Sequence, residues 1–241
     1  KLGKNVKIGP YSIIGDDVEI GDNTVIHSHV VVKGPSVIGK NNEIFQFSSV
    51  GEDCQDKKYA GEPTRLEMGD NNVIRENVTI HRGTVQDESL TKIGSNNLFM
   101  AYTHVAHDCV IGDNFIFANN ESVAVHLHCG DWAILGGMVG VHQLVHIGAH
   151  SFTGLNSIVL KDIPPYVMAS GNGAAPKGLN SEGLKRRGFS AEQIKAVKQA
   201  YRNLYRKGLT VDEALATMDT SEPAVADFAD FIKSSSRGII R

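Results

Sequence analysis

The sequence predicts an all-β solenoid of short parallel strands followed by a small α-helical domain. Three observations support this fold class. An apolar residue recurs at every sixth position through most of the first 160 residues, glycine often follows it, and helix-capping signals begin only after Pro164-Pro165. A fixed short period over such a length indicates a repeat architecture, in which each unit is stabilised by stacking on its neighbours.

The six-residue period runs in three stretches, from Leu2 to Val50, from Met68 to Ile80 and from Ile93 to Val159. Thr153 is the only polar residue at these register positions, although hydrophobic residues make up just 41% of the chain. The period fits short strands joined by tight corners, with one inward side chain per strand. Three strands would close a triangular coil of eighteen residues, and successive coils would pair as parallel strands. We expect the glycines to give the corners backbone freedom.

Two loops interrupt the repeat, at residues 52–66 and 83–92. Val50 and Met68 are separated by three periods, so we expect the first loop to replace two strands and to return in phase. The second loop shifts the register, because the separation of Ile80 and Ile93 is not a multiple of six. Loops that leave a rigid solenoid commonly carry binding residues.

A helical domain is predicted for residues 173–241, after a β-solenoid domain of residues 1–172. Ser190 with Gln193, and Thr210 with Glu213, have the spacing of helix capping boxes. The helical domain also carries a set of basic residues, which is either a docking surface or ordinary solvated surface. This basic patch consists of Lys185, Arg186, Arg187, Arg202, Arg206 and Lys207.

Composition excludes several classes of protein. The formal net charge of -3 gives no bulk attraction to nucleic acid, and no apolar run approaches the roughly 20 residues of a membrane-spanning helix. Three cysteines without metal-ligand spacing predict a reducing compartment, the cytoplasm, rather than a disulfide framework. The chain opens directly in the repeat without Met or a signal-peptide pattern, and we expect that residues preceding it in the natural protein are missing.

The repeat also predicts which side chains meet. Coils of eighteen residues align His107 with Val125 and Gln143 in one column, and Asp108 with His126 in the next.

His104 and His142 add to this cluster of imidazoles, for which three interpretations stand. It is a polar outer face, a metal site, or a catalytic base with its support. A metal site needs three converging ligands, and no ligand set is unambiguous here. An ordinary imidazole has a pKa near 6.5 and is mostly neutral at pH 7, so it can accept a hydroxyl proton.

Several longer motifs resemble one enzyme family. They are IFQFSSVGEDCQDKKYAGEPTRLEMGDNNVIRENVTIHRGTVQ, HVAHDCVIG, AILGGMVGVHQ, EGLKRRGFS and SRGIIR. Together they resemble the UDP-N-acetylglucosamine O-acyltransferase family of hexapeptide-repeat enzymes, over essentially the whole chain but without the family's first coil. The resemblance implies a left-handed parallel β-helix with a carboxyl-terminal helical domain. It also implies transfer of a 3-hydroxyacyl group from acyl carrier protein to the glucosamine 3-hydroxyl of UDP-N-acetylglucosamine, the first step of lipid A biosynthesis.

The resemblance implies a role for each matched residue. His107 resembles the general base, Asp108 its orienting partner, and the Val125 backbone N–H the oxyanion donor. Substrate contacts are implied for a larger set: Asp56 and Lys58 for sugar and phosphate, His104, His126, His142 and Gln143 along the cleft, and Asn180, Glu182, Arg186 and Arg187 for the nucleotide.

The sequence departs from the family pattern at three positions. Val125 replaces a frequent glycine, Leu155 stands where glycine admits a long acyl chain, and Gly173 replaces a histidine found in members with long-chain preference. We expect Val125 and Leu155 to narrow the acyl channel and to favour a donor shorter than hydroxymyristoyl. Gly173 opposes this by making space, and each change is also compatible with neutral repacking.

The resemblance further implies a homotrimer with active sites between subunits, acyl carrier protein as a partner that the basic patch would bind, and no cofactor or metal. Three alternatives remain open at this stage. A sister N-acyltransferase would use an amine acceptor, a γ-type carbonic anhydrase would need zinc, and a solenoid can also be a non-catalytic scaffold. A 3-amino analogue of the acceptor sugar also stays open.

Overall fold

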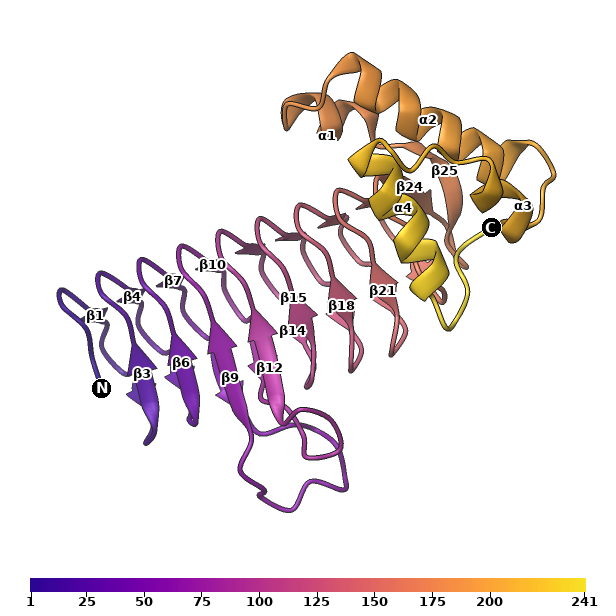
Figure 1. Ribbon diagram of the computed structural model, residues 1–241. Coiled ribbons are helices and arrows are strands. Elements are labelled where there is room, and N and C mark those ends of the chain that lie inside the picture. The colour runs from indigo at the N-terminus through magenta and orange to yellow at the C-terminus, as the bar shows by residue number, and fades with distance from the viewer.

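The computed structural model covers all 241 residues and forms a triangular coil with a helical domain at its carboxyl-terminal end (Figure 1). Three sheets make the faces of the coil, and consecutive strands up to β23 enter the three sheets in turn. The first sheet contains β1 (Lys7–Ile8), β4 (Val25–Ile26), β7 (Glu43–Ile44), β10 (Val73–Ile74), β13 (Leu98–Phe99), β16 (Ile116–Phe117), β19 (Ile134–Leu135), β22 (Phe152–Thr153), β24 (Val167–Ser170) and β25 (Ala175–Leu179).

The second sheet contains β2 (Ile13–Ile14), β5 (Val31–Val32), β8 (Ser49–Glu52), β11 (Thr79–His81), β14 (His104–Val105), β17 (Ser122–Val123), β20 (Gly140–Val141) and β23 (Ile158–Val159). The third sheet contains β3 (Val18–Ile20), β6 (Ser36–Ile38), β9 (Arg65–Met68), β12 (Leu90–Ile93), β15 (Val110–Ile111), β18 (His128–Cys129) and β21 (His146–Ile147). Every strand pair is parallel except β24 with β25.

The core is the column of inward side chains that the six-residue period predicts. Ile26, Ile44, Ile74 and Phe99 pair in line on successive coils and are at most 1% exposed. Burying such a side chain contributes about 1.5–3 kcal/mol, most of which offsets the loss of chain entropy. Because neighbouring coils share the column, no single coil has to be stable alone.

The glycines that follow the register positions allow close stacking rather than unusual backbone angles. At Gly21 an added Cβ would lie 2.6 Å from the backbone of Gly39 in the next coil. The left-handed backbone falls two residues later, for example at Asn23 with φ 59° and at Asn96 with φ 61°. Asn and Asp tolerate this region better than most side chains. The expectation of corner flexibility at these glycines is therefore wrong, and their role is to remove a side chain between coils.

Both loops lie between strands that are neighbours on the coil. Ile38 of β6 pairs with Met68 of β9, so the first loop lengthens one coil without replacing any strand. The expectation that it replaces two strands is wrong, because β8 and β9 follow each other in the order that the uninterrupted coils use. Met68 pairs with Ile93 across the second loop, which accounts for the predicted register shift. The two loops project together from one end of β9 and β12 (Figure 1).

The carboxyl-terminal part begins as an extension of the coil. β25 pairs antiparallel with β24 at the end of the first sheet. Four helices follow: α1 (Ser181–Arg186), α2 (Ala191–Arg206), α3 (Val211–Ala216) and α4 (Pro223–Ser234). The capping boxes predicted at Ser190 and Thr210 are both present, at the start of α2 and α3. None of these helices combines the length and the apolar character needed to cross a membrane.

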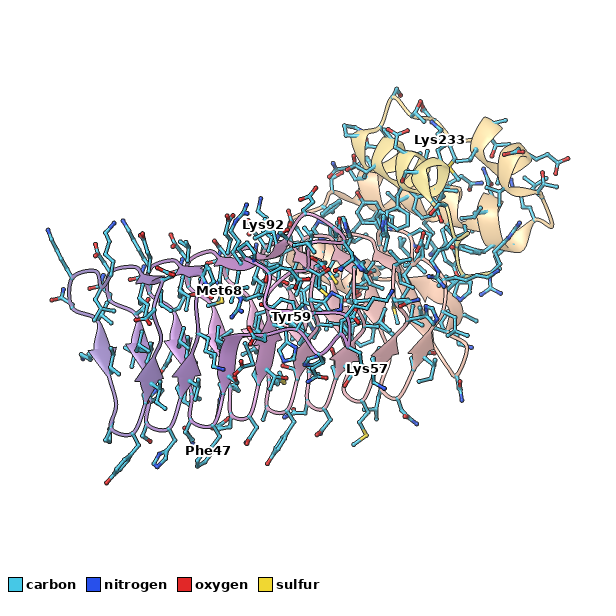
Figure 2. All side chains as sticks on the ribbon, turned by 90° about the horizontal axis from the view of Figure 1, so that it is seen from below. Phe47, Lys57, Tyr59, Met68, Lys92 and Lys233 are labelled. Atoms are coloured by element: carbon cyan, nitrogen blue, oxygen red, sulfur yellow. The ribbon has the colours of Figure 1, made fainter.

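An exposed apolar ridge follows the corner between the first and second sheets. Its members are Tyr11, Phe47, Tyr102, Met138 and Leu155, which are 57–80% exposed. Figure 2 shows Phe47 projecting away from the coil at this edge. Exposed apolar side chains gathered along one edge commonly mark a site of association.

Candidate functional site

A cleft of about 860 Å³ lies at the corner between the second and third sheets. It brings together seven of the predicted site residues, although they span nearly ninety positions of the sequence. They are Asp56, His104, His107, Val125, His126, His142 and Gln143. His81, Leu144 and Leu160 also line it.

The predicted columns are present at this corner. His104 of β14 pairs with Ser122 of β17, and Ser122 pairs with Gly140 of β20. The corner residues that follow are consequently stacked, and the His126 N–H donates to the His107 carbonyl oxygen at 3.3 Å. The parallel register therefore holds the side chains of three coils in a fixed row.

His107 and Asp108 form a buried dyad at the base of the cleft. Nδ1 of His107 lies 2.7 Å from Oδ2 of Asp108, and the two residues are 7% and 2% exposed. Thr84 donates to both Asp108 oxygens, its backbone N–H to Oδ1 at 2.8 Å and its hydroxyl to Oδ2 at 2.6 Å. Because a carboxylate only accepts hydrogen bonds, this arrangement places the imidazole proton on Nδ1 and leaves Nε2 as the free acceptor.

The same contacts keep Asp108 ionised. Burial alone raises the pKa of this carboxyl, but the hydrogen bonds from His107 and Thr84 outweigh burial, and its pKa lies below the ordinary value. Asp108 is thus a stable acceptor for the imidazole, and it carries the negative charge that would stabilise a protonated His107.

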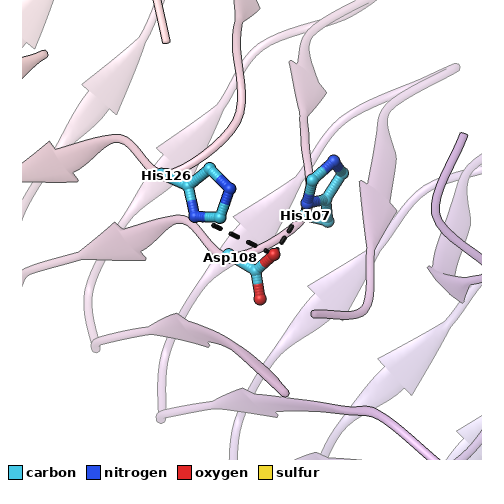
Figure 3. Close-up of side chains that lie close together, drawn as sticks. All are labelled: His107, Asp108 and His126. Carbon is cyan, nitrogen blue, oxygen red and sulfur yellow. Dashed lines mark hydrogen bonds and ion pairs between the residues drawn. The ribbon is translucent and has the colours of Figure 1, made fainter. Parts of the chain in front are cut away.

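His126 makes a second histidine–aspartate contact on the next coil. Its Nδ1 lies 2.7 Å from Oδ2 of Asp87 in the second loop and 4.0 Å from Oδ2 of Asp108. The His107 and His126 rings are almost perpendicular, with centroids 5.5 Å apart. Figure 3 shows both rings turned toward the Asp108 carboxylate.

The backbone N–H of Val125 is an unused donor in the cleft. It has no acceptor in the protein, whereas the next N–H, of His126, is paired with the coil below. Val125 is half-buried and lines the cleft one coil above His107. An unpaired N–H at such a place is suited to a developing negative charge.

Two further histidines line the cleft in the neutral form. The Thr79 hydroxyl lies 2.7 Å from Nδ1 of His104, and burial, followed by the nearby His107, lowers the pKa of His104. Burial and His104 lower the pKa of His81 to about 4. These rings are therefore hydrogen-bonding groups at pH 7 rather than charged ones.

The carboxyl-terminal tail supports the far end of the cleft. Arg237 donates to the Gln143 carbonyl oxygen at 2.5 Å and lies 3.1 Å from Nδ1 of His142. Ser235 and the Asp162–Ile239 bridge hold the tail against the last coil.

Asp56 and Lys58 belong to the first loop, but only Asp56 lines the cleft. The Asp56 carboxylate accepts the Lys58 N–H at 2.9 Å, which tightens the turn between them. Arg82 fixes the loop from below: its guanidinium donates to the Gly51 carbonyl oxygen, to Asp53 and to the Tyr59 hydroxyl.

The four residues matched to nucleotide binding lie at a different corner, between the third and first sheets. Asn180 caps α1 and donates to the His150 carbonyl oxygen. Arg187 stacks on Trp132 at 5.2 Å and contacts His150. Glu182 and Arg186 are exposed on α1. One subunit therefore does not bring these residues to the His107 cleft.

Leu155 and Gly173 also lie outside the cleft. Leu155 is 70% exposed on the apolar ridge. Gly173 has φ 51° and sits in the turn between β24 and β25, with open space where a side chain would point. Of the three positions matched to chain-length selection, only Val125 lines the cleft of a single subunit.

Sequence reasoning missed Thr84, Asp87, Arg237 and Glu121. The first three come from a loop or the tail, where no period predicts which column they approach. Glu121 stands at an inward position just before β17 and is fully buried, and neither carboxylate oxygen has a partner. Burial raises the pKa of Glu121 to about 10, so this side chain is neutral at pH 7. A charged residue at an inward position of the repeat was a signal available in the sequence.

Two family models match the chain. One, described as UDP-N-acetylglucosamine O-acyltransferase, domain 2, matches residues 162–240, and the bacterial transferase hexapeptide model of six repeats matches residues 1–34. Acyl-[acyl-carrier-protein]–UDP-N-acetylglucosamine O-acyltransferases of Stutzerimonas stutzeri and Thiobacillus denitrificans are 57% and 58% identical over 244 residues, which cover 100% of this chain and 95% of each relative.

Solved structures agree with these matches. The UDP-N-acetylglucosamine acyltransferase of Francisella novicida superposes with a TM-score of 0.97 at 44% identity, covering 100% of this chain and 90% of that chain. The UDP-N-acetylglucosamine O-acyltransferase of Moraxella catarrhalis gives 0.96 at 49% identity, covering 100% and 95%. The expected left-handed parallel β-helix with carboxyl-terminal helices is thereby confirmed.

Proposed function

The chain belongs to the UDP-N-acetylglucosamine O-acyltransferase family, and on that premise we propose that it transfers a 3-hydroxyacyl group from acyl carrier protein to the glucosamine 3-hydroxyl of UDP-N-acetylglucosamine, the first step of lipid A biosynthesis. The observation that carries the proposal is the buried His107–Asp108 dyad at the base of the cleft. A cytoplasmic location is part of the proposal and is supported by three cysteines that form no disulfide.

In this mechanism the His107 imidazole is the general base. Asp108 holds the Nδ1 proton, so Nε2 is free to take the proton of the sugar 3-hydroxyl as its oxygen attacks the thioester carbonyl. The carbon–sulfur bond breaks in the next step, and the imidazolium returns its proton to the leaving thiolate. The charge of Asp108 stabilises the imidazolium between these two steps.

The Val125 N–H is the proposed donor to the oxyanion that forms on the thioester carbonyl. It belongs to the coil next to His107 and has no other acceptor. A backbone donor survives a change of side chain, so valine in place of glycine keeps it. Losing one such donor typically costs about 2.7–4 kcal/mol of transition-state stabilisation.

A homotrimer with active sites between subunits is the proposed assembly. It would bring the Asn180–Arg187 segment of one subunit to the His107 cleft of its neighbour, which a single chain does not do. The exposed apolar ridge supports this proposal, since association would cover it.

The basic patch on α1 and α2 is the proposed docking surface for the acidic acyl carrier protein. Charge attraction between exposed groups is screened by salt within about a Debye length. Raising the salt concentration should therefore increase the KM for the carrier protein more than the KM for the nucleotide sugar. Equal sensitivity of the two constants would argue against this surface.

Acyl-chain selection is proposed to follow from Val125 and Leu155, which favour a donor shorter than hydroxymyristoyl, with Gly173 acting in the opposite direction. For Leu155 and Gly173 the proposal depends on the neighbouring subunit, because neither residue lines the cleft of one chain. Val125 narrows the cleft beside the base itself.

The experiment measures acyl transfer from a panel of 3-hydroxyacyl carrier proteins of graded chain length, with UDP-N-acetylglucosamine as acceptor. Wild-type protein is compared with Val125→Gly and Leu155→Gly. We expect turnover with a short-chain optimum, and an optimum at longer chains in both variants. A long-chain optimum in the wild type would contradict the chain-length proposal but would support the proposed acyltransferase activity. The absence of turnover with any donor would overturn the proposed activity.

A further inference from the structure

We propose that His107, Asp108, His126 and Asp87 form an inhibitory binding site for a divalent transition metal ion such as zinc. The inference deepens the proposed function, because it rests on His107 as the base. The bound metal ion would inhibit the reaction and would not act as a cofactor.

Three potential ligand atoms from two coils converge at this corner, and a fourth, from the second loop, lies beside one of them. One ligand atom from each of His107, Asp108 and His126 lies within 4.8 Å of the others. Oδ2 of Asp87 stands 2.7 Å from Nδ1 of His126 and supplies the fourth. Two of the residues are almost completely buried, and the nearly perpendicular rings direct their Nδ1 edges at one point instead of stacking (Figure 3).

The donor set and spacing suit zinc. Zinc binds imidazole nitrogen and carboxylate oxygen at about 2.0–2.2 Å, which places neighbouring donors of a tetrahedral site roughly 3.3–3.5 Å apart. The present separations, 2.7 Å from Asp108 to His107 and 4.0 Å from Asp108 to His126, lie on either side of that spacing. Shifts of less than about 1 Å would bring these three donors to that spacing. Asp87 would reach the ion through its place beside His126, and four protein donors would leave no position for a reactive water.

A contrasting pair of histidines lacks these features. The His128 and His146 rings lie on the outer face of the third sheet with centroids 4.8 Å apart, but they stack at 20° and no third donor completes a group. Adjacent histidines are thus a common result of the repeat, whereas convergence on a carboxylate is particular to the His107 corner.

Metal binding would disable the base through its tautomer. A neutral imidazole carries a single proton, which Asp108 now holds on Nδ1. A metal ion bound at Nδ1 requires that nitrogen's lone pair, so the proton moves by way of solvent to Nε2. Nε2 then becomes a donor and can no longer take the proton of a sugar hydroxyl. Inhibition therefore needs no blockage of the cleft.

The test combines a binding measurement with a rate measurement on metal-stripped full-length protein. Zinc binding is followed by calorimetry, and cobalt in place of zinc reports tetrahedral coordination through its visible absorption. The variants are Asp87→Asn, which removes the loop ligand, and His126→Asn. Glu88→Gln is the matched control, since Glu88 is the exposed neighbour in the same loop. Rates are normalised to the metal-free rate of each variant.

We expect zinc to bind and to abolish turnover, with recovery after chelation. In Asp87→Asn, zinc affinity should fall about 10- to 100-fold, and the zinc concentration that halves the rate should rise by the same factor. Both quantities should be unchanged in Glu88→Gln. No binding, or binding that neither Asp87→Asn nor His126→Asn weakens, would overturn the site. Bound zinc with full activity would overturn the inhibition. The cobalt spectrum needs no turnover, so the metal site is tested even where the proposed activity fails.

Discussion

The direction of the His107 imidazole is decided by the residue that follows it in the chain. Adjacent residues rarely point to the same spot, but the left-handed backbone of Asp108 turns its carboxylate back to Nδ1. The six-residue period predicted that His107, Val125 and Gln143 stack, because the column depends only on coil length. It could not predict Thr84 or Asp87, since the path of a loop is not periodic.

Asp108→Asn should lower kcat by about 10²–10⁴-fold, the usual contribution of a positioned base. An asparagine amide that donates to Nδ1 moves the imidazole proton to Nε2, where it blocks proton transfer. Steady-state kinetics would check this, with Asp16→Asn, an exposed corner aspartate remote from the cleft, as the control. A variant rate within threefold of the wild type would contradict the orienting role.

At the scale of single elements, an unfavourable buried residue stands immediately before β17. Glu121 precedes this strand with its unpaired carboxyl buried. Glu121→Met keeps the length of the side chain and removes the polar group, so the free energy of unfolding should rise by about 1–3 kcal/mol at pH 8. Chemical denaturation measures the difference, and a destabilised variant would contradict the account.

The pH dependence of stability provides a second prediction for Glu121. The pKa in the folded state, about 10, is raised above that of the unfolded chain, so the folded protein retains a proton that the unfolded chain releases above its ordinary pKa of 4.5. The contribution of the protonated Glu121 carboxyl to the stability of the fold is therefore fully present below about pH 4.5, and it is lost as pH rises from there toward 10. The advantage of Glu121→Met should shrink between pH 8 and pH 5, as denaturation at both values would reveal. An advantage of the same size at pH 8 and pH 5 would show that the carboxyl is ionised in the fold.

The first loop depends on Arg82 for its position. Hydrogen bonds from a charged group contribute about 1.5–3 kcal/mol. Their loss should therefore raise the population of the open loop by at least about tenfold. In Arg82→Met, trypsin should cleave after Lys57 and Lys58 correspondingly faster, with Arg65→Gln, at the exposed first residue of β9, as the control. Equal cleavage rates would mean that other contacts fix the loop.

Local signals predicted some elements well and others poorly. The capping boxes of α2 and α3 were read correctly because each is a contact within one turn. The first loop was misread because a twelve-residue insertion is a multiple of the period and leaves the phase unchanged. The antiparallel β25 has no six-residue pattern, since it pairs only along one edge of the last coil.

For the whole molecule, the separation of the His107 cleft from the α1 residues leads to a prediction about assembly. If one site combines residues of two subunits, coexpressing the His107→Ala chain with the Arg186→Ala chain should give mixed oligomers in which some sites carry neither change. These mixed oligomers should be well above either variant alone in activity. Light scattering would give the mass of the assembly. A monomer, or mixed oligomers no more active than the separate variants, would contradict the shared site.

The most direct measurement is the rate of acyl transfer to UDP-N-acetylglucosamine by the wild type and by His107→Ala, with nucleotide-sugar binding measured in parallel. The variant should lose about 10²–10⁴-fold in kcat, while its affinity for the nucleotide sugar should stay close to that of the wild type. A variant that retains the wild-type rate would contradict His107 as the base.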